Sequence, residues 1–230
     1  SVMDWFAQRG FVCWCVDLEG YGRSSKQRDI TCDIANGADD LAAATDFIFA
    51  MRGVRSFLTY GISSGALRAA LFAQRHPERV AALVLVASSP AFGHGSGDFQ
   101  QAFVAQRLAP LQAGRSMAEV AAGLIPTMVA PGYSGPGLAQ ALACMGSITP
   151  TAYQAALGAL VQFEQRAALP GISVPTLCIA GEHDRTAAPS VVQRMADKIP
   201  NSQYLCLGGV GHLLTFEQPD HFVQALLPFV

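Results

Sequence analysis

The sequence of 230 residues has few charged side chains and no long hydrophobic run. Only 14% of its residues are charged, the formal net charge is −2, and lysine and arginine nowhere cluster. This distribution argues against a nucleic-acid partner. The longest wholly apolar run, Val80 to Ala87, is far shorter than the roughly 20 residues that a membrane helix needs. Because half of the residues are apolar, the composition predicts a globular core.

The sequence also has no C-x-x-C pair. We interpret its six cysteines as small buried thiols that behave as hydrophobic residues, with disulfides or a zinc site as the alternatives. Four of them lie in strand-like runs: Cys13, Cys15, Cys178 and Cys206. Such thiols favour a reducing compartment, so we predict a cytoplasmic location. No signal-type apolar segment opens the chain, and any targeting signal would lie upstream of Ser1.

Strand-like apolar runs alternate with helical patterns along most of the chain. The runs are FVCWCVDL (11–18), SFLTY (56–60), RVAALVLVAS (79–88), VPTLCIAG (174–181) and QYLCLGG (203–209). Nearly continuous apolar strands, separated by helices, are typical of parallel sheets covered on both faces. We therefore predict an α/β fold with a doubly wound, mostly parallel sheet.

The alternation stops between residues 91 and 170, where weakly amphipathic helical pieces flank a Gly/Pro-rich stretch, APGYSGPG. We predict that this region is a helical lid inserted over one end of the sheet. The chain then divides into core residues 1–90, the lid 91–170 and core residues 171–230. Before the lid, a helix is predicted to open at Asp39 and to stop at Gly53.

A nucleophile is predicted within GISSG (61–65), which joins the run SFLTY to an Ala-rich helix. G-x-S-x-G at a strand–turn–helix joint is the nucleophile-elbow pattern. The middle residue of so tight a turn is strained and exposes its side chain, which assigns Ser63 as the nucleophile. A Cβ at Gly61 or Gly65 is expected to collide with neighbouring backbone. The Ser64 backbone N–H would bind a developing oxyanion, unless Ser64 only caps the helix.

The sequence has five histidines, any of which could in principle be the general base for the serine. His212 lies in LCLGGVGHLL, on a glycine-rich loop directly after a predicted strand. His76 and His221 belong to helices, and His94 belongs to a flexible loop that would at most touch a substrate. His212 is therefore the predicted base.

An acid that orients the base is predicted in GEHD, which also follows a strand. Asp184 is favoured because it lies farther into the loop, whereas Glu182 would brace the loop and His183 would pack. Ser63, Asp184 and His212 each follow the C-terminal end of a predicted strand, where doubly wound sheets place their chemistry. This order predicts a Ser-His-Asp triad.

These motifs resemble those of the α/β-hydrolase family over nearly the whole chain. DLEGYGRSS (17–25) resembles the family's D-x-x-G-x-G-x-S turn, and GISSG resembles its elbow. GEHDRTAAP (181–189) and GGVGHLLTFEQPDHF (208–222) resemble its acid and histidine segments. Within the family, the lid and the C-terminal third look most like the 3-oxoadipate enol-lactonase and small-esterase branch. That branch more often has a glycine where this chain has Ala66.

The resemblance also reveals a difference at the N-terminal side. Family members have three earlier strands, and an H-G loop after the third donates a second oxyanion N–H. No such motif precedes Asp17. We expect a segment of the same protein to supply them, with its last strand between the runs 11–18 and 56–60.

The resemblance implies hydrolysis of a small or medium ester or lactone, without a metal or an organic cofactor. Arg107, Arg115 and Arg166 are candidates for anchoring a substrate carboxylate. A serine nucleophile argues against the haloalkane dehalogenase and epoxide hydrolase branches, which use aspartate. C–C bond hydrolysis, cofactor-free perhydrolysis and non-catalytic ligand binding remain open as alternatives, and so does the oligomeric state.

Overall fold

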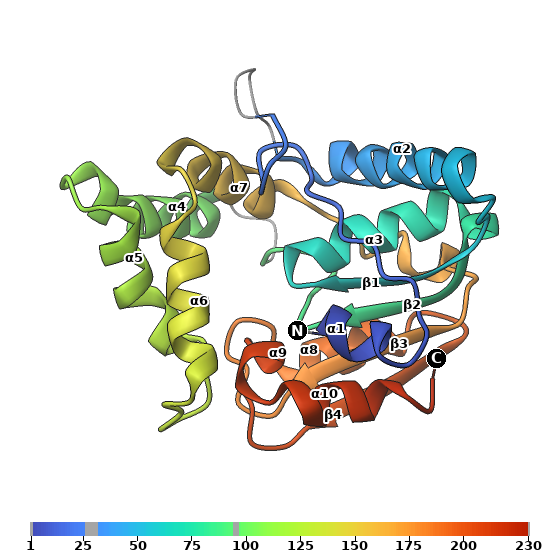
Figure 1. The fold of residues 1–230 in the computed structure, drawn as a ribbon. Helices are drawn as coiled ribbons and strands as arrows, with labels where there is room; N and C mark the ends of the chain where they lie inside the picture. The colour runs from blue at the N-terminus through green and yellow to red at the C-terminus, as the bar shows by residue number, and fades with distance from the viewer. Residues whose placement is uncertain (1, 26–31, 94–96, 230) are drawn as a thin grey trace.

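A computed structural model describes residues 2–25, 32–93 and 97–229. Within them, four parallel strands form one sheet in the order β1-β2-β3-β4 (Figure 1). The strands are β1 (Phe57–Ile62), β2 (Val80–Val86), β3 (Thr176–Gly181) and β4 (Ser202–Leu207). Each coincides with a predicted apolar run. Because the strands are parallel, their C-terminal ends meet at one edge of the sheet.

Helices cover both faces of this sheet. On one face lie α2 (Ile34–Arg52), α3 (Ser64–Arg75) and α8 (Pro189–Ala196), and on the other lie α1 (Val2–Ala7) and α10 (Pro219–Leu226). Leu83 and Leu85 of β2 pack toward α3 and α8, while Val84 and Val86 pack toward α10. Both sides of β2 are thus buried, which explains why its sequence is apolar throughout. The predicted doubly wound α/β fold is confirmed.

Four further α-helices lie between β2 and β3 in the described part of the chain. They are α4 (Gly97–Gln112), α5 (Met117–Leu124), α6 (Pro136–Gly146) and α7 (Pro150–Gln162). Their apolar side chains form a core cluster of their own, and Figure 1 shows them on the side toward which the strand arrows point. The role of residues 91–170 as a lid stays a prediction. Among the described helices, none is both long and apolar enough to cross a bilayer.

The predicted strand at residues 11–18 is wrong. This segment forms no strand, and Val12 and Trp14 are 79% and 41% exposed. A strand requires a neighbour that accepts and donates its backbone hydrogen bonds. Within the described residues, β1 pairs only with β2, so the other edge of β1 offers no partner strand, and Leu58 and Tyr60 on β1 are also exposed.

The helix predicted from Asp39 begins earlier, as α2. Its N-cap is Asp33, whose carboxylate accepts the Asn36 N–H at 2.7 Å. Asn36 and Gly37, in the first turn of α2, are unfavourable in helices, so the sequence placed the start at Asp39, six residues after this cap. The predicted stop is confirmed: Gly53 has a φ of 71° and donates its N–H to the Phe49 carbonyl.

The cysteines are less buried than predicted. Cys178 in β3 is fully buried, and this burial raises the pKa of its thiol to about 12. Cys15 and Cys206 are exposed instead, and Cys13 is only half-buried. In the described part of the chain β4 is an edge strand with a neighbour only on the β3 side, and most of its residues, Cys206 among them, stay partly or fully exposed.

Candidate active site

Ser63 lies at the joint between β1 and α3, in strained backbone geometry. Its φ of 51° and ψ of −122° fall where non-glycine residues are rare. A Cβ on Gly61 would lie 2.6 Å from the Gly65 carbonyl oxygen, so the reason given for Gly61 is confirmed. The same reason for Gly65 is wrong, because a Cβ there would meet no described atom within 4 Å. Ser64 is the first residue of α3, where a backbone N–H has no acceptor within its own helix.

Asp184 lies in the loop between β3 and α8 and is 3% exposed. Its Oδ1 accepts the backbone N–H groups of Thr186 at 2.7 Å and Ala187 at 2.8 Å. Its Oδ2 lies 2.8 Å from His212 Nδ1. Two backbone donors thus fix the orientation of the carboxylate and leave its second oxygen directed at the imidazole.

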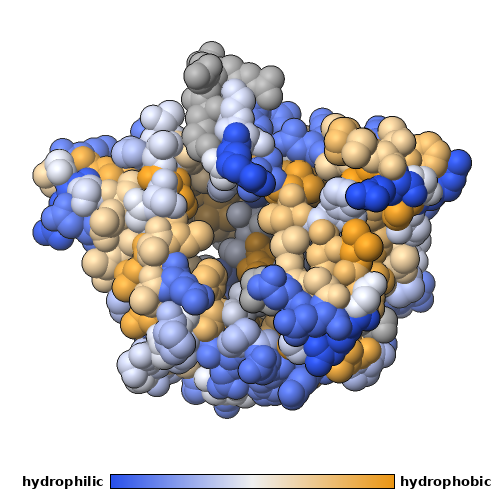
Figure 2. Space-filling model, in the orientation of Figure 1, coloured by the Kyte–Doolittle hydropathy of each residue, from blue (hydrophilic) through white to orange (hydrophobic). Residues whose placement is uncertain are grey.

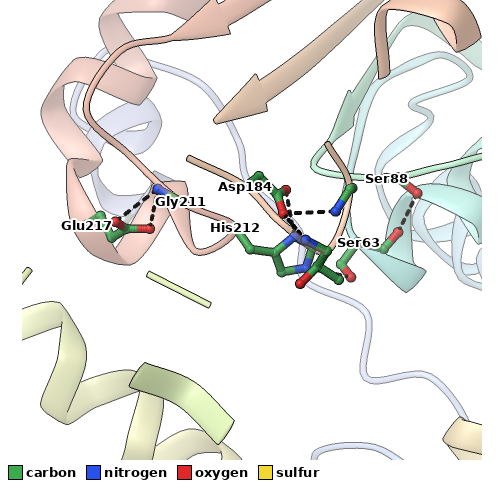
Figure 3. A network of polar contacts seen from close by, with 8 residues as sticks. Ser63, Ser88, Asp184, Gly211, His212 and Glu217 are labelled. Carbon is green, nitrogen blue, oxygen red and sulfur yellow. Dashed lines mark hydrogen bonds and ion pairs between the residues drawn. The ribbon is translucent and has the colours of Figure 1, made fainter. Parts of the chain in front are cut away.

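His212 lies between Asp184 and Ser63 and is 2% exposed (Figure 3). Its Nε2 is 3.1 Å from Ser63 Oγ. An ionised carboxylate can only accept a hydrogen bond, so Nδ1 carries the proton and Nε2 is left free to accept one from the serine. The structure therefore brings together the three side chains that the sequence singles out, in the order that proton transfer requires.

In the part of the chain that the structure describes, the other acidic and histidine residues considered in the sequence form no hydrogen bond with Ser63. Glu182 accepts the Gly209 N–H at 2.8 Å, so it links the acid loop to the histidine loop. His183 was expected to pack, but its side chain is 42% exposed and lies beside Glu182, so this expectation is wrong. His221 is exposed on α10, and His94 lies outside the described residues.

Two residues that the sequence did not indicate hold the backbone of the elbow. Ser88, directly after β2, donates its hydroxyl to the Ser63 carbonyl at 2.9 Å. Arg68, buried in α3, donates to the Ser64 carbonyl at 2.9 Å. In the sequence, Ser88 begins a serine pair after an all-apolar strand, and Arg68 lies in an Ala-rich helix. Neither pattern indicates which backbone carbonyl the side chain would contact.

The three arginines proposed for substrate binding differ in their surroundings. Arg166 is paired with Glu164 at 2.9 Å, Arg107 lies over the ring of Phe103, and Arg115 is exposed. Their role in binding a carboxylate stays a prediction. Among the described residues, His, Cys, Asp and Glu side chains nowhere gather in threes as a metal site requires.

Replacing Gly181 by alanine is expected to lower kcat/KM about 100-fold, because small misplacements of catalytic groups have effects of this size. A Cβ on Gly181, the last residue of β3, would lie 2.1 Å from the Gly211 carbonyl oxygen and would displace the loop that carries His212. Gly123→Ala is the matched control, since a Cβ there meets no described atom within 4 Å. Wild-type kcat/KM in folded Gly181→Ala would refute the expectation.

Known proteins share this architecture. A pimeloyl-[acyl-carrier protein] methyl ester esterase from Xanthomonas campestris is 30% identical over 225 residues, which cover 94% of this chain and 83% of the relative. The solved structure of a thermophilic esterase from Thermogutta terrifontis matches 92% of this chain and 76% of its own, with a TM-score of 0.78 and 25% identity. The structure of the enol-lactonase from Burkholderia xenovorans LB400 matches 92% of this chain and 78% of its own, with a TM-score of 0.78. At 22% identity, this match supports the fold alone.

A parallel sheet covered by helices, with a strained serine on a strand–helix turn beside a buried histidine, defines the class of nucleophile-elbow enzymes. The model of the family described as the alpha/beta hydrolase fold matches residues 2–219. The chain belongs to the α/β-hydrolase fold family and is an enzyme of that family. The predicted family is thereby confirmed.

Proposed function

We propose that the protein is a serine hydrolase that cleaves a small or medium carboxylic ester or lactone. The observation that carries this proposal is the pair of distances at His212, 3.1 Å to Ser63 Oγ and 2.8 Å to Asp184 Oδ2. Both side chains beside the serine are almost completely buried, where a charge pair is stronger than in water. The names of the esterase relatives support an ester as the bond that is cleaved.

In the first step, Ser63 Oγ attacks the carbonyl carbon while His212 Nε2 takes the hydroxyl proton. The imidazolium that forms is stabilised by Asp184, which stays ionised. His212 then returns the proton to the leaving alcohol, and the acyl group remains on Ser63. A water molecule activated by His212 releases the acid and restores the serine.

The tetrahedral intermediate carries an oxyanion, for which the Ser64 N–H is the proposed donor. It lies at the start of α3, whose dipole also favours a negative charge. Loss of one such donor typically costs about 10²–10³ in kcat.

Residues 91–170 are proposed to be the lid that selects the substrate. Figure 2 shows a hollow between the part formed by α4–α6 and the part that contains the sheet, with hydrophobic residues on both sides of it. An apolar pocket suits a small or medium acyl chain or lactone ring. The free thiols exposed at Cys15, Cys144 and Cys206 suit the proposed cytoplasmic location.

A fluorophosphonate probe tests the proposal, with the labelled peptide located by mass spectrometry in the full-length protein. Ser63 is expected to be labelled in the wild type, and Ser63→Ala is expected to be unlabelled and inactive. Ser64→Ala keeps the backbone N–H and should still be labelled at Ser63. Labelling at Ser64, or labelling that persists in Ser63→Ala, would refute the assignment.

A substrate panel separates the activities that share this triad. p-Nitrophenyl esters, aliphatic methyl esters and lactones report on C–O cleavage, ring-fission diketones on C–C hydrolysis, and peracid formation on perhydrolysis. Turnover of the esters or lactones with the highest kcat/KM is expected. Tight binding of a ligand with negligible turnover throughout would instead favour a non-catalytic protein.

A further inference from the structure

Glu217 is a buried carboxylate that the proposed mechanism does not use. It ends α9 (Leu214–Glu217) and is 7% exposed. In the described part of the chain no Lys, Arg or His side chain forms an ion pair with it; backbone N–H groups are its partners. Gly211 N lies 2.9 Å from Oε1 and 3.0 Å from Oε2, and Ala130 N lies 2.7 Å from Oε2. Burying a charge is costly without such donors, so this arrangement calls for an explanation.

The two donors come from different parts of the molecule. Gly211 immediately precedes His212, whereas Ala130 belongs to the connection between α5 and α6, 87 residues away from Glu217. The side chain of Glu217 therefore connects the loop that carries His212, the proposed base, to the proposed lid. Figure 3 shows the Glu217–Gly211 contact to the left of the His212 ring, on the side away from Ser88.

The two segments that Glu217 joins also contact each other directly. The His212 N–H donates to the Met128 carbonyl at 2.7 Å, and the Tyr133 hydroxyl donates to the Phe216 carbonyl at 2.9 Å. A Cβ on Gly211 would lie 2.6 Å from the Met128 oxygen, so only a glycine allows this approach. Because His212 itself takes part, a shift of residues 128–130 would shift the imidazole.

We propose that Glu217 is a positioning residue, which fastens the Met128–Ala130 segment to the histidine loop and thereby sets the distance from His212 Nε2 to Ser63 Oγ. The inference rests on the proposed function, since it assigns His212 as the base. Glu217 touches neither the substrate nor the reacting atoms, and acts through the backbone on either side of His212.

The chemistry of the contact requires a carboxylate. If Gln replaced Glu217 with its amide oxygen at the Oε2 position, its NH₂ group would face the Gly211 N–H. With the oxygen at the Oε1 position, the NH₂ group would face the Ala130 N–H. Either orientation sets two donors against each other, although the side chain keeps its shape. Glu217→Gln therefore weakens the Gly211 link or breaks the Ala130 link, without leaving a cavity.

The test compares Glu217→Gln with wild type and with Glu182→Gln in the full-length protein. Glu182 is the matched control because it accepts one N–H, that of Gly209, and a Gln oxygen can still accept it. Active sites are counted by fluorophosphonate titration. Per active site, Glu217→Gln is expected to lose about 10- to 100-fold in kcat and in labelling rate, with KM within about twofold, as misplaced catalytic groups do. Glu182→Gln should match the wild type.

A purely structural role would lower the melting temperature and the number of active sites but leave kcat per site unchanged, and that result would overturn the inference. If the wild type itself neither turns over nor labels at Ser63, the proposed function fails instead. If Glu217→Gln does not fold, Tyr133→Phe is the variant that tests the inference, because it removes the hydrogen bond from the Tyr133 hydroxyl to the Phe216 carbonyl. A loss of about fivefold in kcat per site, equivalent to one hydrogen bond, is then expected, and an unchanged kcat refutes the inference.

Discussion

Replacing His212 by alanine is expected to lower kcat/KM for an ester by about 10⁵- to 10⁶-fold, because the loss of either the nucleophile or the base disables a triad almost completely. Nothing else described lies within hydrogen-bond reach of Ser63 Oγ to take its proton; the contact made by that hydroxyl is the one to His212 Nε2 at 3.1 Å. The measurement is kcat/KM with a p-nitrophenyl ester, together with the rate of fluorophosphonate labelling.

The control for this experiment is His221→Ala. His221 is exposed on α10 and its ring contacts Gln218, so its removal should leave kcat/KM unchanged. Circular dichroism shows whether the buried space left at position 212 disturbs the fold. A folded His212→Ala enzyme with activity within tenfold of the wild type would exclude His212 as the base.

Asp184→Asn is expected to lower kcat by about 10⁴-fold, mainly through the tautomer of His212. The backbone N–H groups of Thr186 and Ala187 both donate to Oδ1, so the amide oxygen of an asparagine must occupy that position. The amide NH₂ then faces His212 Nδ1, which must accept instead of donate. The imidazole proton moves to Nε2, toward Ser63, and the base is lost although the geometry is retained.

Asp197→Asn is the matched control, because Asp197 is exposed at the C-terminal end of α8. It should keep wild-type kcat and KM. In Asp184→Asn, KM should change little, since Asp184 is 3% exposed and lies behind the imidazole. More than a tenth of the wild-type kcat in Asp184→Asn would mean that this carboxylate does not orient the base.

The strands and the elbow were predictable because local chemistry leaves few alternatives there. The run Val80–Val86 is apolar on both sides, which suits only a strand covered on both faces. Gly61 was predictable because the turn brings backbone within 2.6 Å of where its Cβ would lie. In contrast, residues 11–18 have strand-like composition but no partner strand in the described chain, and composition cannot report a missing neighbour.

The contacts made by Glu217 and Ser88 were not predictable, because each joins segments that are far apart in sequence. Ser88 donates to Ser63, 25 residues away, and Glu217 accepts from Ala130, 87 residues away. A lone acid or hydroxyl in a sequence carries no information about which distant N–H or carbonyl it meets. The exposure of Cys15 and Cys206 was missed for a related reason, since burial depends on what covers a strand as well as on its composition.

By itself, the sequence determined the four paired strands, the turn that holds Ser63, and the loops that hold Asp184 and His212. These features follow from side-chain polarity, glycine and short-range geometry. Only the tertiary structure decided that Ser63 and His212, 149 residues apart, come within 3.1 Å, and that Glu217 ties the histidine loop to residues 128–130. The parallel sheet brings distant loops to one edge, while packing and backbone hydrogen bonds set the distances between them.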